Sequence, residues 1–136
     1  MRPNPRPAAD PAPVDLSTRE AGQALLRTFF NIADAWKLTA AERMALLGVR
    51  SRSTFHLWRE GKSGPLSADT LERISYVFGI YKALQMLLPS AEAADAWVRK
   101  PNDAPLFNGQ SALERMLSGH VADLYEVRRY LDAQRG

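Results

Sequence analysis

The feature of this sequence that most limits its fold is a repeated signal for the start of a helix. Three times a serine or threonine stands three positions before a glutamate, and apolar residues at helical spacing follow. In this arrangement, a capping box, the hydroxyl and the carboxylate each bind a backbone N–H that the first helical turn leaves unpaired. The three pairs are Ser17 with Glu20, Thr39 with Glu42, and Ser111 with Glu114.

The rest of the chain continues the helical pattern. Ser67 and Ser90 are further candidate caps, and Gly48, Pro89 and Gly119 stand where helices end. The predicted helices cover residues 17–36, 39–48, 53–58, 68–78, 80–88, 90–100, 111–119 and 120–134. No stretch shows the alternation of a half-buried strand or a hairpin signal. The sequence therefore predicts an all-α fold.

Composition divides the chain into three parts. Residues 1–15 hold five of the nine prolines and few large apolar side chains, so we expect a flexible tail there. The helices form a region of residues 16–89 and a smaller C-terminal region of residues 90–136. There is no cysteine, and no apolar run has the length of a signal peptide or membrane span. We expect a cytoplasmic protein with no membrane partner.

Positive charge is concentrated in the middle of the chain. Residues 36–65 carry six basic and two acidic side chains, although the whole chain has a net charge of only +3. Within residues 52–59, Arg52, Ser53, His56 and Arg59 fall on one arc of a helical wheel. Thr54, Phe55, Leu57 and Trp58 fall on the other arc.

This arrangement predicts a helix-turn-helix, with GVRSRSTFHLWREGKSG (residues 48–64) as its turn and second helix. Arginine forks suit guanine edges, and hydroxyls suit phosphates. The basic arc could instead be an ordinary solvated face. The predicted DNA-binding residues are Arg50, Arg52, Ser53, Thr54, His56, Arg59 and Lys62, of which Arg50 and Lys62 flank the helix and suit the phosphate backbone.

The register of this motif is irregular. If Gly48 is the turn glycine, the position four residues earlier, usually small, is Met44, and Phe55 and Trp58 come one place late. If Ala45 is the small residue, Val49 stands where glycine is expected. Either the turn is one residue longer than usual, or the helices pack differently.

The last predicted helix has an apolar stripe with an arginine at its edge. Val121, Leu124, Val127 and Leu131 form the stripe, and Arg128 lies beside it. A long cation there can bury its stem and present its charge to a partner, or reach water from the edge of the chain's own core. Both interpretations stay open at this point.

Catalysis is not indicated. His56 and His120 lie in different regions without an acid–base constellation around either. There is no glycine-rich phosphate loop and no metal-ligand spacing. We therefore expect a protein that is not an enzyme and that binds no metal and no cofactor.

The sequence resembles antitoxins of the Xre/MbcA/ParS group. The resemblance is carried by LTAAERMALLGVRSRSTFHLWREG in the middle and by AWVRKPNDAPLFNGQSALERMLSGHVADLYEVRRYLDAQRG at the end. It departs from the pattern at Ala112, where proline is expected. Proteins of this group are all-α, with an Xre-type DNA-binding region and a C-terminal toxin-binding region.

The resemblance implies a toxin partner with a RES domain, which uses NAD either to degrade it or to ADP-ribosylate a target. Residues 16–89 would then bind operator DNA as part of a homodimer that represses its own operon, and residues 90–136 would cover the toxin's active site. The implied toxin-binding residues are Trp97, Asn102, Phe107, Leu124, Tyr125, Arg128, Arg129, Leu131 and Arg135. The alternative is a stand-alone helix-turn-helix transcriptional regulator with a C-terminal dimerisation or effector module.

Overall fold

The computed structural model describes residue 15 and residues 17–136, and over these the chain forms seven α-helices and one isolated bridge pair. The helices are α1 (Arg19–Ala35), α2 (Ala40–Leu47), α3 (Arg52–Arg59), α4 (Ala68–Leu87), α5 (Ala91–Trp97), α6 (Ala112–Met116) and α7 (Val121–Arg135). The predicted all-α fold is confirmed. The predicted tail, apart from Asp15, lies outside the described residues. Within the described part, no helix is both long and apolar enough to cross a membrane.

One of the three predicted capping boxes forms completely. Thr39 and Glu42 form the full capping box, since the Glu42 N–H donates to the Thr39 hydroxyl at 3.1 Å and the Thr39 N–H donates to the Glu42 carboxylate at 2.8 Å. The box predicted at Ser17 is wrong. Thr18 caps α1, because the Ser17 hydroxyl is bound to the Asp15 carboxylate at 2.6 Å.

The other predicted caps are present. Ser67 caps α4 and Ser90 caps α5, each accepting from a backbone N–H three residues later. Ser111 caps α6 in the same way, but its hydroxyl also donates to the Glu114 carboxylate at 3.3 Å. That contact takes the place of the bond from the backbone N–H of Ser111 to Glu114 that a full box requires.

The prediction of two helices, 68–78 and 80–88, separated at Gly79 is wrong, because α4 runs through this glycine as one continuous helix. Gly79 is buried against α7, and a Cβ atom added there would lie 2.5 Å from Cζ of Arg128. The glycine therefore allows a side chain of α7 to lie directly on the α4 backbone. It serves the packing of two helices and does not end one.

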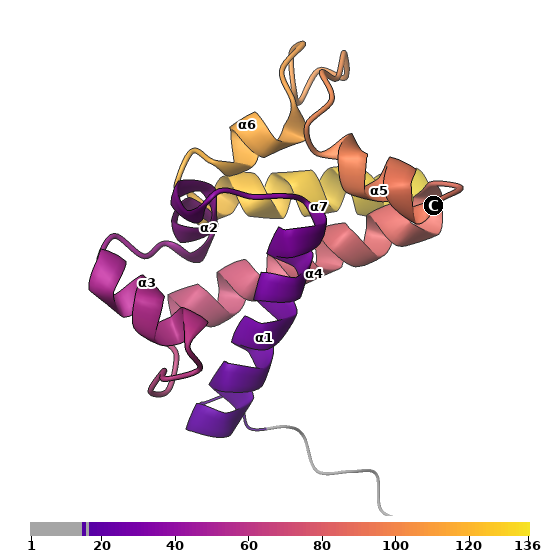
Figure 1. Ribbon diagram of the computed structural model, residues 1–136. Helices are drawn as coiled ribbons and strands as arrows, with labels where there is room; N and C mark the ends of the chain where they lie inside the picture. The colour runs from indigo at the N-terminus through magenta and orange to yellow at the C-terminus, as the bar shows by residue number, and fades with distance from the viewer. Residues whose placement is uncertain (1–14, 16) are drawn as a thin grey trace, which may run out of the picture.

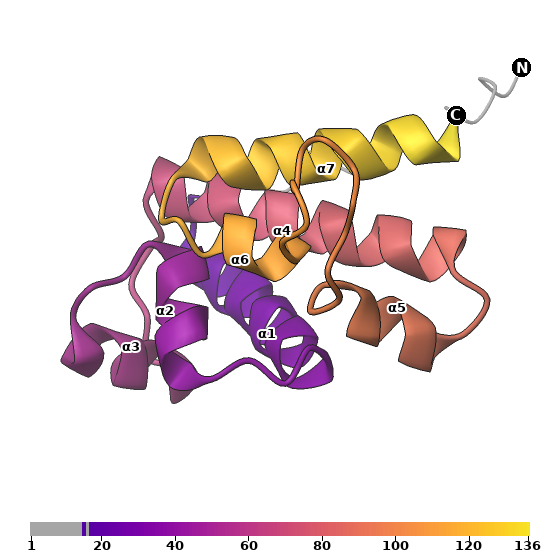
Figure 2. The same cartoon turned by 90° about the horizontal axis from the view of Figure 1, so that it is seen from above.

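Helix α4 is the centre of the molecule. It contacts α1 and α2 from the first region and α5 and α7 from the second (Figure 1). Figure 2 shows α4 and α7 side by side and running in the same direction, so that α5, α6 and the loop between them return the chain to the start of α4. Buried side chains from both regions, including Trp36, Phe55, Leu84 and Leu124, belong to one core.

A buried arginine ties the start of α4 to the start of α7. The side chain of Arg73 is 11% exposed. Its Nε donates to the Asp69 carboxylate at 2.9 Å, and an NH2 group donates to the Gly119 carbonyl at 2.9 Å. The guanidinium also lies against Gly48, where an added Cβ would be 2.8 Å from Arg73 Nε. One side chain thus contacts the turn after α2 and the turn before α7.

A second arginine ties the segment after α5 to the first region. Arg99 donates to the carbonyls of Trp36 and Lys37 at 3.3 and 2.9 Å and to the Glu42 carboxylate at 3.1 Å. Burial favours the neutral form of Glu42, but bonds from the Thr39 N–H and Arg99 outweigh it, and the pKa of Glu42 lies below its ordinary value. The charged form of Glu42 is therefore part of the native structure.

Candidate functional site

Helices α2 and α3 form the predicted helix-turn-helix. Four residues, 48–51, separate them, at the long end of the usual range. Gly48 has a left-handed φ of 72°, and the Val49 N–H closes the end of α2 on the Met44 carbonyl at 3.0 Å. The Ser51 hydroxyl caps α3, which begins at Arg52 rather than at residue 53. The longer turn accounts for the late positions of the two aromatic residues of α3.

The inner face of α3 is held by its aromatic side chains. Phe55 is 1% exposed and packs edge-on against Phe30 of α1, with ring centroids 5.8 Å apart. Trp58 is half-buried on the same face. Leu57, predicted to lie on this arc, is instead 47% exposed. It lies about 200° round the helix from Phe55, and so short a helix buries only a narrow strip.

The outer face of α3 and its flanks carry the predicted DNA-binding residues. Six of the seven are exposed, namely Arg50, Arg52, Ser53, His56, Arg59 and Lys62. Thr54 is half-buried and its N–H is bound to the Ser51 cap at 3.2 Å. Lys62 lies 3.3 Å from the Glu60 carboxylate, and both side chains are exposed, so the pair neutralises little. The DNA contacts themselves stay predictions.

A groove of about 360 Å³ separates the outer edges of α2 and α3. Met44 and Phe55 line its apolar part, and Arg50, Arg52 and His56 line the rest. Cationic side chains above an apolar floor suit an anionic chain that passes along the groove. This groove lies on one side of the outer face of α3.

Three of the predicted toxin-binding residues lie in the core. Leu124 is 0% exposed, and Leu131 and Phe107 are each 2% exposed. The apolar stripe of α7 closes the chain's own core against α4, as one of the two interpretations of the sequence required. These three buried side chains support the exposed residues of α7 and of the loop before α6, and they cannot contact a partner in this fold.

Arg128 is directed onto α4. Its NH1 group donates to the Ser75 carbonyl at 3.3 Å, its guanidinium covers Gly79, and its Nε lies 3.6 Å from the Asp132 carboxylate. The side chain is 37% exposed. Arg128 therefore binds groups of its own chain, whereas the sequence-based prediction had it present its charge to a toxin.

Asn102, Trp97 and Phe107 shape the loop between α5 and α6. The backbone N–H groups of Asn102 and Gly109 bind carbonyls across the loop, and the Asn102 side chain accepts from the Ala104 N–H at 2.9 Å. Phe107 packs edge-on against Trp97 at 5.8 Å. It also packs against Tyr130 of α7 at 5.1 Å. This aromatic cluster fixes the loop on α7.

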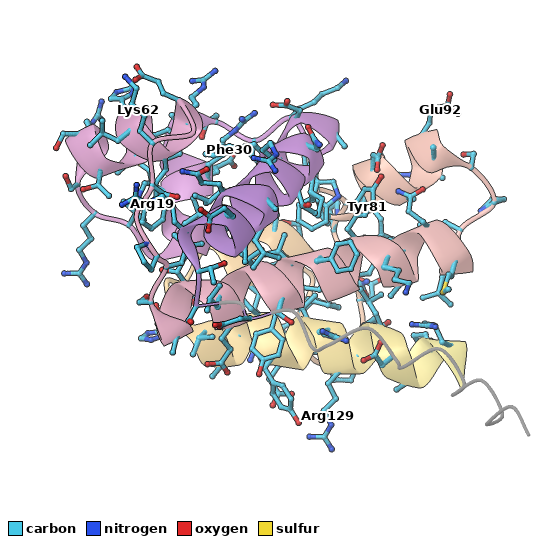
Figure 3. The ribbon with its side chains drawn as sticks, turned by 90° about the horizontal axis from the view of Figure 1, so that it is seen from below. Arg19, Phe30, Lys62, Tyr81, Glu92 and Arg129 are labelled. Atoms are coloured by element: carbon cyan, nitrogen blue, oxygen red, sulfur yellow. The ribbon has the colours of Figure 1, made fainter. Side chains whose placement is uncertain are left out.

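The remaining predicted residues of α7 face solvent. Tyr125 is 44% exposed, and Arg129 and Arg135 are exposed. Among the described residues, the ion pair of Arg135 is a loose contact with Asp132, at 3.8 Å. Figure 3 shows Arg129 pointing away from the body of the molecule, on the side opposite α3. The predicted toxin-binding and DNA-binding surfaces thus do not overlap.

Sequence reasoning missed the two arginines that join the regions. Arg73 interrupts the apolar face of α4, four residues after Asp69, and this i, i+4 pair in a buried stretch was a usable signal. Arg99 offered no such signal, because all its acceptors lie 57 or more residues away along the chain.

Within the described residues, the acidic and histidine side chains form no metal-binding cluster. Over residue 15 and residues 17–136, no group of three or more histidine, aspartate or glutamate side chains is placed to hold a metal ion. His56 lies on α3 and His120 precedes α7, on different elements.

Comparison with known proteins covers both surfaces. Residues 15–79 match the model of the antitoxin Xre-like helix-turn-helix domain. Residues 83–136 match the model of the antitoxin Xre/MbcA/ParS C-terminal toxin-binding domain. The chain is also 52% identical, over 113 residues, to the uncharacterized protein y4oB of Sinorhizobium fredii, and the match covers 83% of this chain and 85% of that protein. The first match ends at Gly79 and the second begins at Ala83, and both positions lie inside α4.

Proposed function

Since this chain belongs to the Xre/MbcA/ParS antitoxins, we propose that its toxin is a RES-domain enzyme that uses NAD and that the chain neutralises it by covering the active site. Its helix-turn-helix and toxin-binding domains make DNA and a toxin its two classes of partner. An antitoxin acts by binding, so the proposal assigns it no catalytic role and no cofactor. Residues 90–136 carry the toxin contacts, and residues 16–89 carry the DNA contacts.

The observation that carries this proposal is the outward face of α7. Tyr125, Arg129 and Arg135 are exposed along a helix whose other face is fixed in the core. Tyrosine and arginine are the residue types that dominate binding energy at protein interfaces. A rigid helix also loses little entropy when it docks. The guanidinium groups would pair with acidic side chains around the toxin's NAD pocket.

The second part of the proposal is repression of the chain's own operon. The exposed arc of α3 suits a major groove, and two copies of the chain related by two-fold symmetry would read a palindromic operator. Because α3 and α7 lie on opposite sides of the molecule (Figure 3), one chain has room for both partners at once. Repression by the complex of antitoxin and toxin is therefore sterically allowed at the level of the single chain.

The test of the toxin contact is co-purification of the full chain with the RES-domain protein encoded beside it, measured with an affinity titration. The double variant Arg129→Glu and Arg135→Glu should lower toxin affinity about tenfold or more, because interface charges then repel. Arg19→Glu, at an exposed arginine of α1, is the matched control and should leave the affinity unchanged.

A gel-shift assay with the promoter DNA, run beside this titration, separates the proposal from its alternative. If the full chain shifts its promoter DNA but binds no toxin, it acts as a stand-alone transcriptional regulator. If it binds the toxin but the double Glu variant binds equally well, the α7 contact is refuted.

A further inference from the structure

A second groove lies on the other side of α3, between α3 and α1. Its volume is about 460 Å³. Figure 3 shows α1 beside α3, with Phe30 on α1 and Lys62 beyond the end of α3. The groove is lined by apolar residues, Phe30 and Trp58 among them, and by polar residues that include Arg27, Asn31 and Arg59.

The cations of this groove differ in whether they already have a partner. Arg43, which also lines it, is bound to the Asp34 carboxylate at 2.8 Å and to the Leu38 carbonyl at 2.9 Å. Arg27 and Arg59 make no ion pair with any residue in the part of the chain that the structure describes. Both are exposed.

The acidic side chains of the groove do not cancel this charge. Asp34 is bound by Arg43, and Glu60 lies 3.3 Å from Lys62. Against these two acids stand four cations, Arg27, Arg43, Arg59 and Lys62, so the groove and its end keep a net positive charge among the described residues. The groove is suited to an anionic group that passes between α1 and α3.

The geometry of B-DNA indicates which anion reaches this place. The major groove is about 12 Å wide, so a helix seated in it has a phosphate backbone on each side. The groove between α2 and α3, with Arg50 and Arg52, lies on one side of the outer face of α3. The groove between α1 and α3 lies on the other side, where a second backbone would pass if α3 were seated in a major groove.

We infer that α1 is part of the DNA-binding surface and that Arg27, with the Asn31 amide beside it, contacts a backbone phosphate. The contact carries no base information, since it reaches only the sugar–phosphate chain. It widens the DNA interface beyond the helix-turn-helix itself. This inference rests on the proposed DNA binding of α3.

The test is the salt dependence of DNA binding by the full chain. Wild type and Arg27→Gln are titrated with the promoter fragment and with a scrambled fragment at four salt concentrations. One lost phosphate contact should reduce the slope of log K against log salt by about 0.9. The affinity for both fragments should fall by the same factor, about three- to tenfold near 0.1 M salt, because positioning contacts act on all sequences.

Arg19→Gln is the matched control, since Arg19 is an exposed arginine of the same helix that does not line the groove. It should bind DNA like the wild type, and both variants should unfold at the wild-type temperature. If the wild type binds DNA and Arg27→Gln keeps its slope and affinity, the inference is wrong while the proposed function stands. If the wild type binds neither fragment, the proposed DNA role fails as well.

Discussion

The turn glycine of the helix-turn-helix gives the sharpest prediction, because two separate effects meet there. Gly48 has a φ of 72°, in the left-handed region, and a Cβ atom would lie 2.8 Å from Nε of Arg73. Gly61 has a φ of 79° and no atom within 4 Å of its Cβ position. Replacing either with alanine strains the backbone, but only Gly48→Ala also displaces a side chain.

The two costs can be estimated separately. A left-handed alanine costs about 1–2 kcal/mol at either site. Displaced from Gly48, the buried Arg73 would lose one of its two bonds, to the Asp69 carboxylate or the Gly119 carbonyl, and one charge-assisted bond contributes about 1.5–3 kcal/mol. We expect Gly48→Ala to lower the free energy of unfolding by about 2.5–5 kcal/mol in total and Gly61→Ala by about 1–2 kcal/mol.

The assay is urea unfolding of the wild type and both alanine variants, repeated in an Arg73→Met background. Removing Arg73 should abolish the excess loss at Gly48 and leave the loss at Gly61 unchanged, since distant sites add independently. Equal losses at the two glycines in the wild-type background would refute the role we give to Arg73.

Three further predictions follow from other contacts. Gly79→Ala should stabilise the Arg128→Ala variant by about 1 kcal/mol but should not stabilise the wild type, because only the wild type has the Arg128 side chain lying on Gly79. The measurement is the free energy of unfolding of the wild type, the two single variants and the double variant, and an equal gain in both backgrounds would contradict the contact between Arg128 and Gly79. Although burial opposes its ionisation, hydrogen bonds hold the pKa of Glu42 below its ordinary value, so its stabilising charge is lost as pH falls through that folded pKa. Glu42→Gln should then show a smaller drop in melting temperature than wild type between about pH 6 and about pH 3, and equal drops would argue against it. Leu124→Ala should cost about 2–5 kcal/mol of unfolding free energy. Tyr125→Ala removes an edge-on contact with Tyr76 and should cost only about 1 kcal/mol while it weakens toxin binding. Similar melting temperatures for the two variants would be inconsistent with the burial of Leu124.

What the sequence determined by itself is the set of local features. The starts of four helices, at Thr39, Ser67, Ser90 and Ser111, follow from caps and backbone groups only three residues apart. The exposed arc of α3 also follows from local periodicity. Such interactions join residues within one helical turn, so they can be predicted from the spacing of residues in the sequence.

What only the tertiary structure decided is which face of each element meets which other element. An apolar stripe on α7 fits either a core or a partner, and the position of α4 beneath it buries Leu124 and Leu131. From the sequence alone, a glycine within a helical pattern predicts the end of a helix. The structure shows that Gly79 instead makes room for the Arg128 side chain of another helix. These contacts join residues about 50 positions apart, and they depend on how the helices pack together rather than on the spacing of residues along the chain.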